Sequence, residues 1–257
     1  MFEEYYTPLP DKDAYLERIG LKEEALPPTA DTLHRLISAQ LANIPFENLD
    51  VFEKRLCPDL RIEALFDKII TRRRGGYCFE LNGLFQKLLE ALGYDCYSIV
   101  MHGLRGGSVA YPAHRGIIVR LPEGKAYCDV GFGGAVPFFP AYLDGRTTPD
   151  GFFIEKYDEG LCVCGPGKDG VMRTQAFSDV PAYAVDFIPL NFHMSQWSES
   201  IFRLRPMVSL RRENGGVSLD GDTLRIRCEG NVEERKLRDR ADYFCALREH
   251  FGIELPL

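Results

Sequence analysis

The 257-residue sequence predicts an α+β fold in three parts. Up to about residue 93, apolar residues recur at the three- and four-residue spacing of amphipathic helices. Between about 94 and 185, short apolar runs alternate with Gly, Pro and Asp, which is typical of a small barrel or curled sheet. The last part mixes strand-like runs with a closing helical pattern. We therefore expect a helical domain (1–93), a β-barrel domain (94–185) and a C-terminal α/β lid (186–257).

The helical part contains four patterns that combine an apolar stripe with start or stop residues. The first is short and ends at Gly20. The fourth follows two glycines and ends at Gly93. We expect these helices at about 15–19, 29–41, 61–72 and 78–92, and a loop at 43–49.

The middle and C-terminal parts contain short strand-like runs separated by turn residues. A hairpin turn is expected at 122–125, and 181–191 reads as a segment that crosses between the two parts. Strands are expected at 95–101, 116–121, 126–130, 151–154, 161–164, 171–177, 202–210, 216–219 and 223–228, followed by a helix at 238–251.

Composition narrows the classes of function. The formal net charge of −7 argues against general nucleic-acid binding, and no uncharged run is long enough to span a bilayer. The acidic N-terminus is unlike a signal peptide, and the eight cysteines contain no C-x-x-C pair. We expect a cytoplasmic enzyme without a membrane or nucleic-acid partner and without a metal site, and the oligomeric state stays open.

The fourth helix begins at a cysteine. Cys78 lies in its first turn, where unpaired backbone N–H groups and the helix dipole favour an anion. A thiol in that position ionises more readily, and the thiolate is the nucleophile. Gly75 and Gly76 are expected to let the chain turn tightly and a substrate approach. Cys78 is therefore the candidate nucleophile, and the alternative is a cysteine that only packs. The preceding run of Arg72–Arg74 is either a solvated or ion-paired face or a site that attracts an anion.

A histidine and an aspartate flank the predicted hairpin. His114 stands at the entrance of the outgoing strand, and Asp129 is a lone carboxylate among apolar neighbours in the returning strand. An aspartate in such a strand needs a partner, and this histidine is the nearest candidate.

The register of the hairpin leaves a gap between the two side chains. If the turn centres on Glu123 and Gly124, Asp129 lies about three residues, or about 10 Å, from the level of His114. A bulge or strong twist at Gly116 would have to bring them together. The alternative is that Asp129 only ties down the end of a strand.

The three side chains together suit acyl transfer. A thiolate attacks an acyl carbon, a histidine takes and returns the proton, and a carboxylate fixes the ring tautomer. The order Cys, His, Asp along the chain is also that of papain-like thiol enzymes.

Several motifs resemble one known family, the arylamine N-acetyltransferases. The resemblance extends over nearly the whole chain and is most specific in the R-G-G-x-C and D-V-G-F-G-G motifs. It is carried by the segments Asn43–Asp50, Arg73–Glu80, Asn82–Phe85, Asp129–Gly134, Asn191–Phe202 and Phe251–Ile253.

The resemblance implies a three-domain fold with a helical bundle, a β-barrel and an α/β lid, and a catalytic triad of Cys78, His114 and Asp129. It also implies a ping-pong reaction in which acetyl-CoA acylates the cysteine and an arylamine or hydrazine nitrogen takes the acetyl group. Acetyl-CoA is then a substrate, and no cofactor is permanently bound. By the same resemblance Phe46 and Phe132 line the acceptor pocket. Residues near the CoA cleft would be Gly133, Gly134 and His193.

The chain departs from the family pattern at two places. Arg115 follows the histidine, and its positive charge beside the base is expected to lower the histidine pKa. Glu199 lies in the serine-rich stretch, where it would repel a CoA phosphate.

Two other functions remain open from the sequence. The first is an amide synthase that acts on a carrier-bound thioester in natural-product biosynthesis. The second is a thiol hydrolase or transglutaminase-like enzyme, which would use water or a protein amine.

Overall fold

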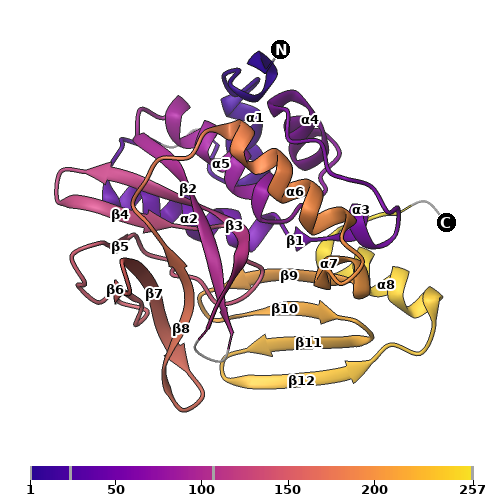
Figure 1. Ribbon diagram of the computed structural model, residues 1–257. Coiled ribbons are helices and arrows are strands. Elements are labelled where there is room, and N and C mark those ends of the chain that lie inside the picture. The colour runs from indigo at the N-terminus through magenta and orange to yellow at the C-terminus, as the bar shows by residue number, and fades with distance from the viewer. Residues whose placement is uncertain (1, 23–24, 106–107, 256–257) are drawn as a thin grey trace.

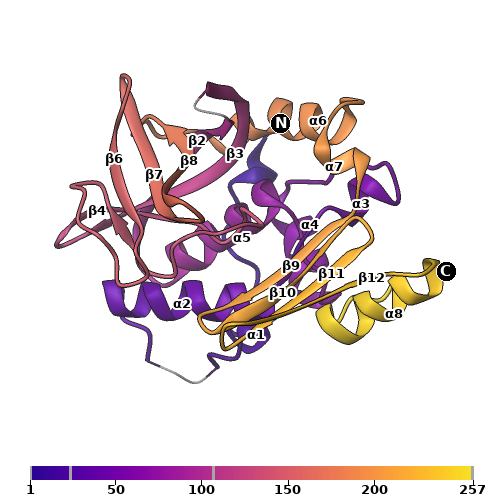
Figure 2. The same ribbon diagram turned by 90° about the horizontal axis from the view of Figure 1, so that it is seen from below.

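The computed structural model describes residues 2–22, 25–105 and 108–255 and has the α+β fold that the sequence predicts. Figures 1 and 2 show two sheets side by side, with the N-terminal helices packed against them. A short 3-10 helix, Glu3–Tyr5, comes first. The helices of the first part are α1 (Lys12–Ile19), α2 (Ala30–Asn43), α3 (Leu49–Phe52), α4 (Ile62–Phe66) and α5 (Cys78–Ala91).

The ends of these helices follow from local capping. The Asp11 side chain accepts from the N–H of Ala14 at the start of α1, and Gly20 ends that helix with a φ of 80°. Thr29 caps α2 in the same way, and Gly93 follows α5 with a φ of 87°. The single helix expected at 61–72 is instead α4 followed by one π-helical turn, Asp67–Thr71.

The middle of the chain forms a nearly closed seven-stranded sheet in the order β5-β4-β3-β2-β8-β7-β6. All its neighbouring strands are antiparallel. The two edge strands, β5 and β6, approach each other, as a barrel requires. The strands are β2 (Asp95–Arg105), β3 (Ser108–Leu121), β4 (Gly124–Cys128), β5 (Ala141–Tyr142), β6 (Phe153–Tyr157), β7 (Gly160–Gly167) and β8 (Gly170–Phe177).

The C-terminal part forms a five-stranded antiparallel sheet in the order β1-β9-β10-β11-β12. Helix α8 (Arg240–Phe251) packs on this sheet through Tyr243, Leu247 and Phe251, which join Leu210 and Leu224 in one core. Figure 1 shows α6 (Phe187–Gln196) and α7 (Ile201–Leu204) linking the barrel to this sheet. The sheet strands are β1 (Phe46–Glu47), β9 (Met207–Arg212), β10 (Gly215–Asp220), β11 (Thr223–Cys228) and β12 (Asn231–Lys236).

Three elements differ from the sequence prediction. The expected crossing segment at 181–191 contains a 3-10 turn, Ala184–Asp186, and most of α6. The expected strand at 202–210 begins as α7 and becomes β9 only at Met207. The fully exposed strand β12 is not predicted at all, because its polar residues carry no alternating pattern.

The division into domains at 93/94 and 185/186 stays a prediction, although the change from helices to strands lies between α5 and β2. No helix among the described residues combines the length and apolar composition that spanning a bilayer requires.

Strand β1 joins the N-terminal part to the C-terminal sheet, where the sequence predicts a loop. Phe46 pairs with Ser209, and Glu47 pairs with Val208. On its other side β1 meets the chain that leads to Cys78, because the N–H of Glu47 donates to the carbonyl of Gly76 at 2.8 Å. A Cβ atom at Gly75 would lie 1.9 Å from the carbonyl oxygen of Pro45. The missing side chain of Gly75 is therefore what allows this close approach.

Gly75→Ala is expected to lower the free energy of unfolding by about 2 kcal/mol or more, because backbone atoms of the Pro45 segment must move to admit the methyl group. Thermal unfolding followed by circular dichroism measures the change. Gly103→Ala is the matched control, since a Cβ atom there meets nothing within 4 Å. Equal melting temperatures for the two variants would contradict this account of Gly75.

Candidate active site

Cys78 is the first residue of α5, as the sequence predicts, and it is buried. The Glu80 carboxylate reaches back to the start of the helix and accepts from the N–H of Tyr77 at 3.1 Å. This bond holds the chain at the point where it enters the helix. The Cys78 side chain is therefore fixed at a helix N-terminus, where a negative charge is favoured.

Glu80 belongs to a buried ion-pair network under the start of α5. Lys68 Nζ lies 2.7 Å from Glu80 and 2.8 Å from Asp50. Arg74 lies 2.6 Å from Glu47 and 3.3 Å from Asp50. Three carboxylates thus share these two cations, and Asp50 also pairs with Lys54 at 3.1 Å. Burial raises the pKa of Glu80 to about 7, even though Lys68 opposes that shift.

The arginine run that precedes Cys78 divides between two roles. Arg74 is buried in this network and holds β1, so it is not free to attract a ligand. Arg72 is exposed and pairs with Asp67 at 2.8 Å, and Arg73 is exposed. The expectation of a solvated or ion-paired face is confirmed for this run.

His114 and Asp129 are in direct contact. His114 Nε2 lies 2.6 Å from Asp129 Oδ2, and both residues are buried. The hairpin pairs Ile117 with Cys128, so the next pair brings Asp129 opposite Gly116. His114 lies two residues before Gly116 and therefore on the same face of the sheet.

The predicted gap of three residues is thus a gap of two. Diagonal neighbours on one face of a sheet lie about 7–8 Å apart, which an imidazole and a carboxylate can bridge. The turn centres on Pro122 and Glu123, one residue earlier than expected. A β-bulge does occur next to His114, but it lies between β3 and β2 and not at Gly116.

The electrostatics of the site favour a protonated imidazole. Burial lowers the pKa of His114, but the Asp129 carboxylate and the Cys78 sulfur outweigh it and raise the pKa to about 10. Burial likewise opposes the charge of Asp129, yet His114 and the donors around the carboxylate hold its pKa below the usual range. The arrangement therefore suits an imidazolium between a thiolate and a carboxylate.

Two further side chains hold Asp129, and both escape the sequence reasoning. Asn82, one turn after Cys78 on α5, donates to Asp129 Oδ1 at 2.8 Å. The Tyr127 hydroxyl donates to Asp129 Oδ2 at 2.7 Å. Asn82 lies four residues after the cysteine, and that helical spacing is the signal that places it on the same side of α5.

A cavity of about 480 Å³ opens above Cys78 and His114. The predicted residues Phe46, Phe132, Gly133 and Gly134 all border it. Phe132 packs edge-to-face on His114, with ring centroids 5.4 Å apart. The rest of the wall is mainly apolar and includes Leu104, Ala110, Met194, Ile201, Phe202 and Met207, with Tyr111, Thr174 and Gln175 as its polar members.

Three predicted residues are not among those described on the wall of this cavity. Gly75 and Gly76 do not border the cavity and have no positive φ, so the prediction that they admit substrate is wrong. Their absent side chains make room for Pro45 and Glu80 instead. His193 is exposed on α6 outside the cavity wall, and its ring contacts Tyr111 with centroids 5.2 Å apart.

Of the two departures from the family pattern, the structure bears on Arg115, and the expected repulsion between Glu199 and a CoA phosphate stays a prediction. Arg115 turns away from His114 and donates to Ser98 at 2.7 Å, with its guanidinium carbon 4.6 Å from the centroid of the Phe187 ring. The pKa of His114 is raised and not lowered, because Asp129 and Cys78 outweigh burial. Glu199 is exposed between α6 and α7.

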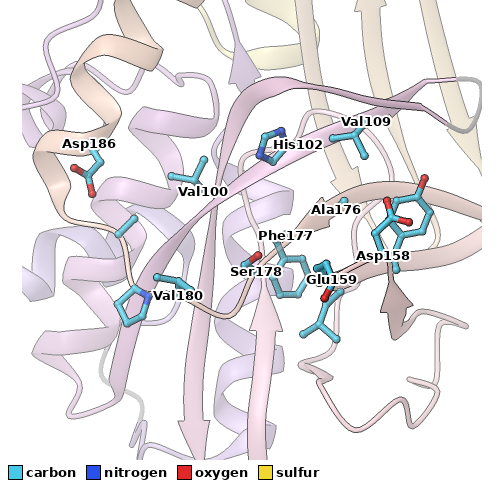
Figure 3. Close-up of a pocket in the computed structure, with 15 residues that line it drawn as sticks. Val100, His102, Val109, Asp158, Glu159, Ala176, Phe177, Ser178, Val180 and Asp186 are labelled. Carbon is cyan, nitrogen blue, oxygen red and sulfur yellow. The ribbon is translucent and has the colours of Figure 1, made fainter.

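A second cavity, of about 420 Å³, lies on the barrel beside β8 (Figure 3). His102, Asp158, Glu159 and Asp186 lie along it, and no cysteine is among the residues described on its wall. The described residues contain no group of three or more His, Cys, Asp or Glu that could hold a metal ion. The cavity at Cys78 is therefore the one whose chemistry fits acyl transfer.

Lys68→Met is expected to lower the free energy of unfolding by about 3–5 kcal/mol, because it leaves the buried Glu80 carboxylate without its cation. Urea unfolding at pH 7 measures the loss. Lys22→Met serves as the control, since Lys22 forms an exposed pair with Glu17. A Lys68 variant as stable as this control would show that the network carries little of the stability.

Asp129→Asn is expected to slow alkylation of Cys78 by iodoacetamide at pH 7 by about two orders of magnitude. The carboxylate is the main group that raises the pKa of His114, so its loss lets burial lower that pKa. The imidazole is then neutral at pH 7 and no longer stabilises a thiolate, and the rate recovers only toward alkaline pH.

The rate at Cys78 is followed between pH 5.5 and 9 by mass spectrometry of the alkylated peptide. Asp95→Asn is the control, because Asp95 pairs with Arg120 at the surface. If the alkylation rate of Asp129→Asn depended on pH as the wild-type rate does, the Asp129 carboxylate would not be the group that stabilises the imidazolium.

Known proteins resemble this chain in sequence and in fold. A family model described as N-acetyltransferase matches residues 29–257. An arylamine N-acetyltransferase of Mycobacterium tuberculosis is 31% identical over 255 residues, which cover 95% of this chain and 90% of the relative. The structure of the Mycobacterium marinum arylamine N-acetyltransferase matches with a TM-score of 0.87 at 31% identity, covering 95% of this chain and 93% of that one. The same enzyme in complex with CoA matches with a TM-score of 0.86 over the same shares of both chains, again at 31% identity. The chain belongs to the arylamine N-acetyltransferase family.

Proposed function

We propose that this protein transfers an acetyl group from acetyl-CoA to the nitrogen of an arylamine or arylhydrazine through an acyl-enzyme on Cys78. The observation that carries the proposal is the buried contact of His114 with Asp129, 2.6 Å long, next to the mainly apolar cavity that His114 and Cys78 both border. The CoA complex of the M. marinum relative supports acetyl-CoA as the donor, and the names of the relatives support an arylamine as the acceptor.

In the first half-reaction the Cys78 thiolate attacks the carbonyl carbon of the acetyl thioester. The carbon–sulfur bond to CoA then breaks, and the leaving CoA sulfur takes the proton held by His114. The positive end of the α5 helix dipole favours the negative charge that develops during attack. The product is an acetyl thioester on Cys78 and a neutral His114.

In the second half-reaction the amine nitrogen attacks the thioester carbon on Cys78. His114 takes a proton from the nitrogen, the carbon–sulfur bond breaks, and the thiolate–imidazolium pair is restored. Asp129 keeps the imidazole in one orientation through both steps. The aromatic rings of Phe46 and Phe132 would contact the aromatic ring of the acceptor, since both border the cavity.

Intact-protein mass spectrometry tests the proposal. Brief exposure to acetyl-CoA is expected to add one acetyl group, and an arylamine such as 5-aminosalicylate is expected to remove it. Cys78→Ser is expected to stay folded and acquire no acetyl adduct, because a hydroxyl does not ionise as a thiol does and is a much weaker nucleophile.

Cys228→Ser is the matched control, since Cys228 is an exposed thiol on β11. It should acquire the adduct as the wild-type protein does. An adduct that water removes as fast as the amine does would indicate a hydrolase, and the absence of any adduct would contradict acetyl-CoA as the donor.

A further inference from the structure

A series of buried, hydrogen-bonded polar side chains continues from Asp129 into the barrel. Tyr127 on β4 is fully buried, and Gln175 on β8 is 1% exposed. The Tyr127 hydroxyl lies 2.7 Å from Asp129 Oδ2 and 3.1 Å from the side-chain oxygen of Gln175. The side-chain nitrogen of Gln175 has no partner among the described residues. Buried polar groups are costly unless they are hydrogen-bonded, so this arrangement needs a physical explanation.

The number of available hydrogen-bond protons decides the direction of each hydrogen bond in this series. Tyr127 has one hydroxyl proton but faces two acceptor oxygens, one on Asp129 and one on Gln175. Asp129 is ionised and can only accept, and a bond to a charged acceptor is the stronger of the two. The proton of Tyr127 therefore goes to Asp129. The Tyr127 oxygen is then left with lone pairs toward Gln175, where it needs a donor.

Turning the Gln175 amide by half a turn supplies that donor. The –NH₂ group then faces Tyr127 and gains a partner, and the side-chain oxygen takes the former place of the nitrogen. The contact between two acceptor oxygens is thereby replaced by a hydrogen bond. The amide and hydroxyl dipoles then align in a single direction that ends at the Asp129 carboxylate, which strengthens each bond in the series.

We propose that Gln175 donates to Tyr127 and Tyr127 donates to Asp129, and that these two residues position the carboxylate that orients His114. The inference rests on the proposed function, because it takes Asp129 as the orienting member of the triad. Gln175 and Tyr127 act through Asp129 in this scheme and are positioning residues. A residue that only filled space at position 175 could be replaced by Met without consequence for Cys78.

Gln175→Glu separates positioning from packing because its effect depends on pH. The introduced carboxyl has nearly the shape of the amide. In its protonated form it donates to Tyr127, as the amide does. In its ionised form it can only accept a hydrogen bond, so the Tyr127 hydroxyl turns to donate to it. The Tyr127 oxygen and Asp129 Oδ2, about 2.7 Å apart, are then left without a proton between them. Asp129 must then move away or take up a proton, and either change removes its charge from His114.

The sign of the pH dependence follows directly. Burial raises the pKa of the introduced carboxyl, so it stays protonated in mild acid and ionises as the pH increases. Cys78 reactivity in Gln175→Glu is therefore expected to match the wild type at pH 5.5. It is expected to fall about tenfold below the wild type as the carboxyl ionises. Gln175→Met, which cannot donate, is expected to be slower by a similar factor at every pH.

The experiment measures the rate of iodoacetamide alkylation at Cys78 between pH 5.5 and 9, relative to the wild type at each pH. The other titratable or charged groups that face Asp129 or Tyr127 are His114, Cys78, Cys128 and Arg211, and all are retained in these variants. A pH-dependent change in the ratio therefore reports the ionisation of the introduced carboxyl and its effect on Asp129 and His114. The assay uses no acetyl-CoA, so a failure of the proposed acetyl transfer, seen as the absence of an adduct in the wild type, is distinguished from a failure of this inference.

Gln40→Glu is the matched control for a buried charge. Gln40 is 1% exposed, accepts from the Tyr15 hydroxyl at 3.0 Å and also has an unpartnered nitrogen, but its partner lies in α1 and not at the site. It should show no pH-dependent change at Cys78. Tyr127→Phe combined with Gln175→Glu tests the hydroxyl itself, and the pH-dependent fall should disappear. A rate ratio for Gln175→Glu that does not change with pH would overturn the inference, and so would a pH-dependent fall that persists in the double variant without the hydroxyl. Melting temperatures confirm that each variant is folded.

Discussion

The Asp129 carboxylate is where the first two parts of the chain meet. It accepts from Asn82 on α5, from His114 and Tyr127 on the barrel strands, and from the N–H of Gly131 just beyond it. A carboxylate with no exposed surface would be strongly disfavoured without such donors. These four bonds make its burial tolerable, and the one from Asn82 also fixes α5 relative to the hairpin. Because the buried Asp129 carboxylate needs hydrogen-bond donors from both parts, meeting that need brings Cys78 and His114 together.

The ion-pair network plays the corresponding role at the other end of the site. It joins the start of α5, the π-helical turn and β1 through Lys68, Arg74 and the carboxylates between them. Buried ion pairs contribute little net stability compared with apolar packing, but their directional bonds specify one arrangement. Here that arrangement sets the direction in which α5 begins. The geometry of the nucleophile thus depends on charges that never contact a substrate.

Local patterns in the sequence predict the parts of the fold that are decided locally. Helices α1, α2 and α5 have capping residues and apolar stripes within their own segments, and all three are found. The contact of His114 with Asp129 is predictable as a pairing of residue types, although the register calculation overstates their separation. The motifs carried enough information to identify the family over most of the chain.

The elements that the sequence misses depend on distant partners. Strand β1 is two residues long and exists because β9, about 160 positions later, pairs with it. Strand β12 has no buried side chain and is held through its pairing with β11. Helix α6 has apolar residues on several sides and Pro189 in its first turn, which hides the helical period. The direction of the Arg115 side chain is likewise set by Ser98, Gln86 and Phe187, none of which is adjacent in sequence.

The pairing of β1 with β9 has a consequence for the order of assembly during synthesis. Phe46 leaves the ribosome long before Met207 and Phe202, yet all three border the same cavity. Translation proceeds at about 5–20 residues per second, so the nucleophile-bearing helix is complete many seconds before its cavity can close. During that interval β1 presents an unpaired edge, and unpaired edges bind other strands. Its length of two residues limits that hazard, because a strand so short offers few backbone groups to a wrong partner.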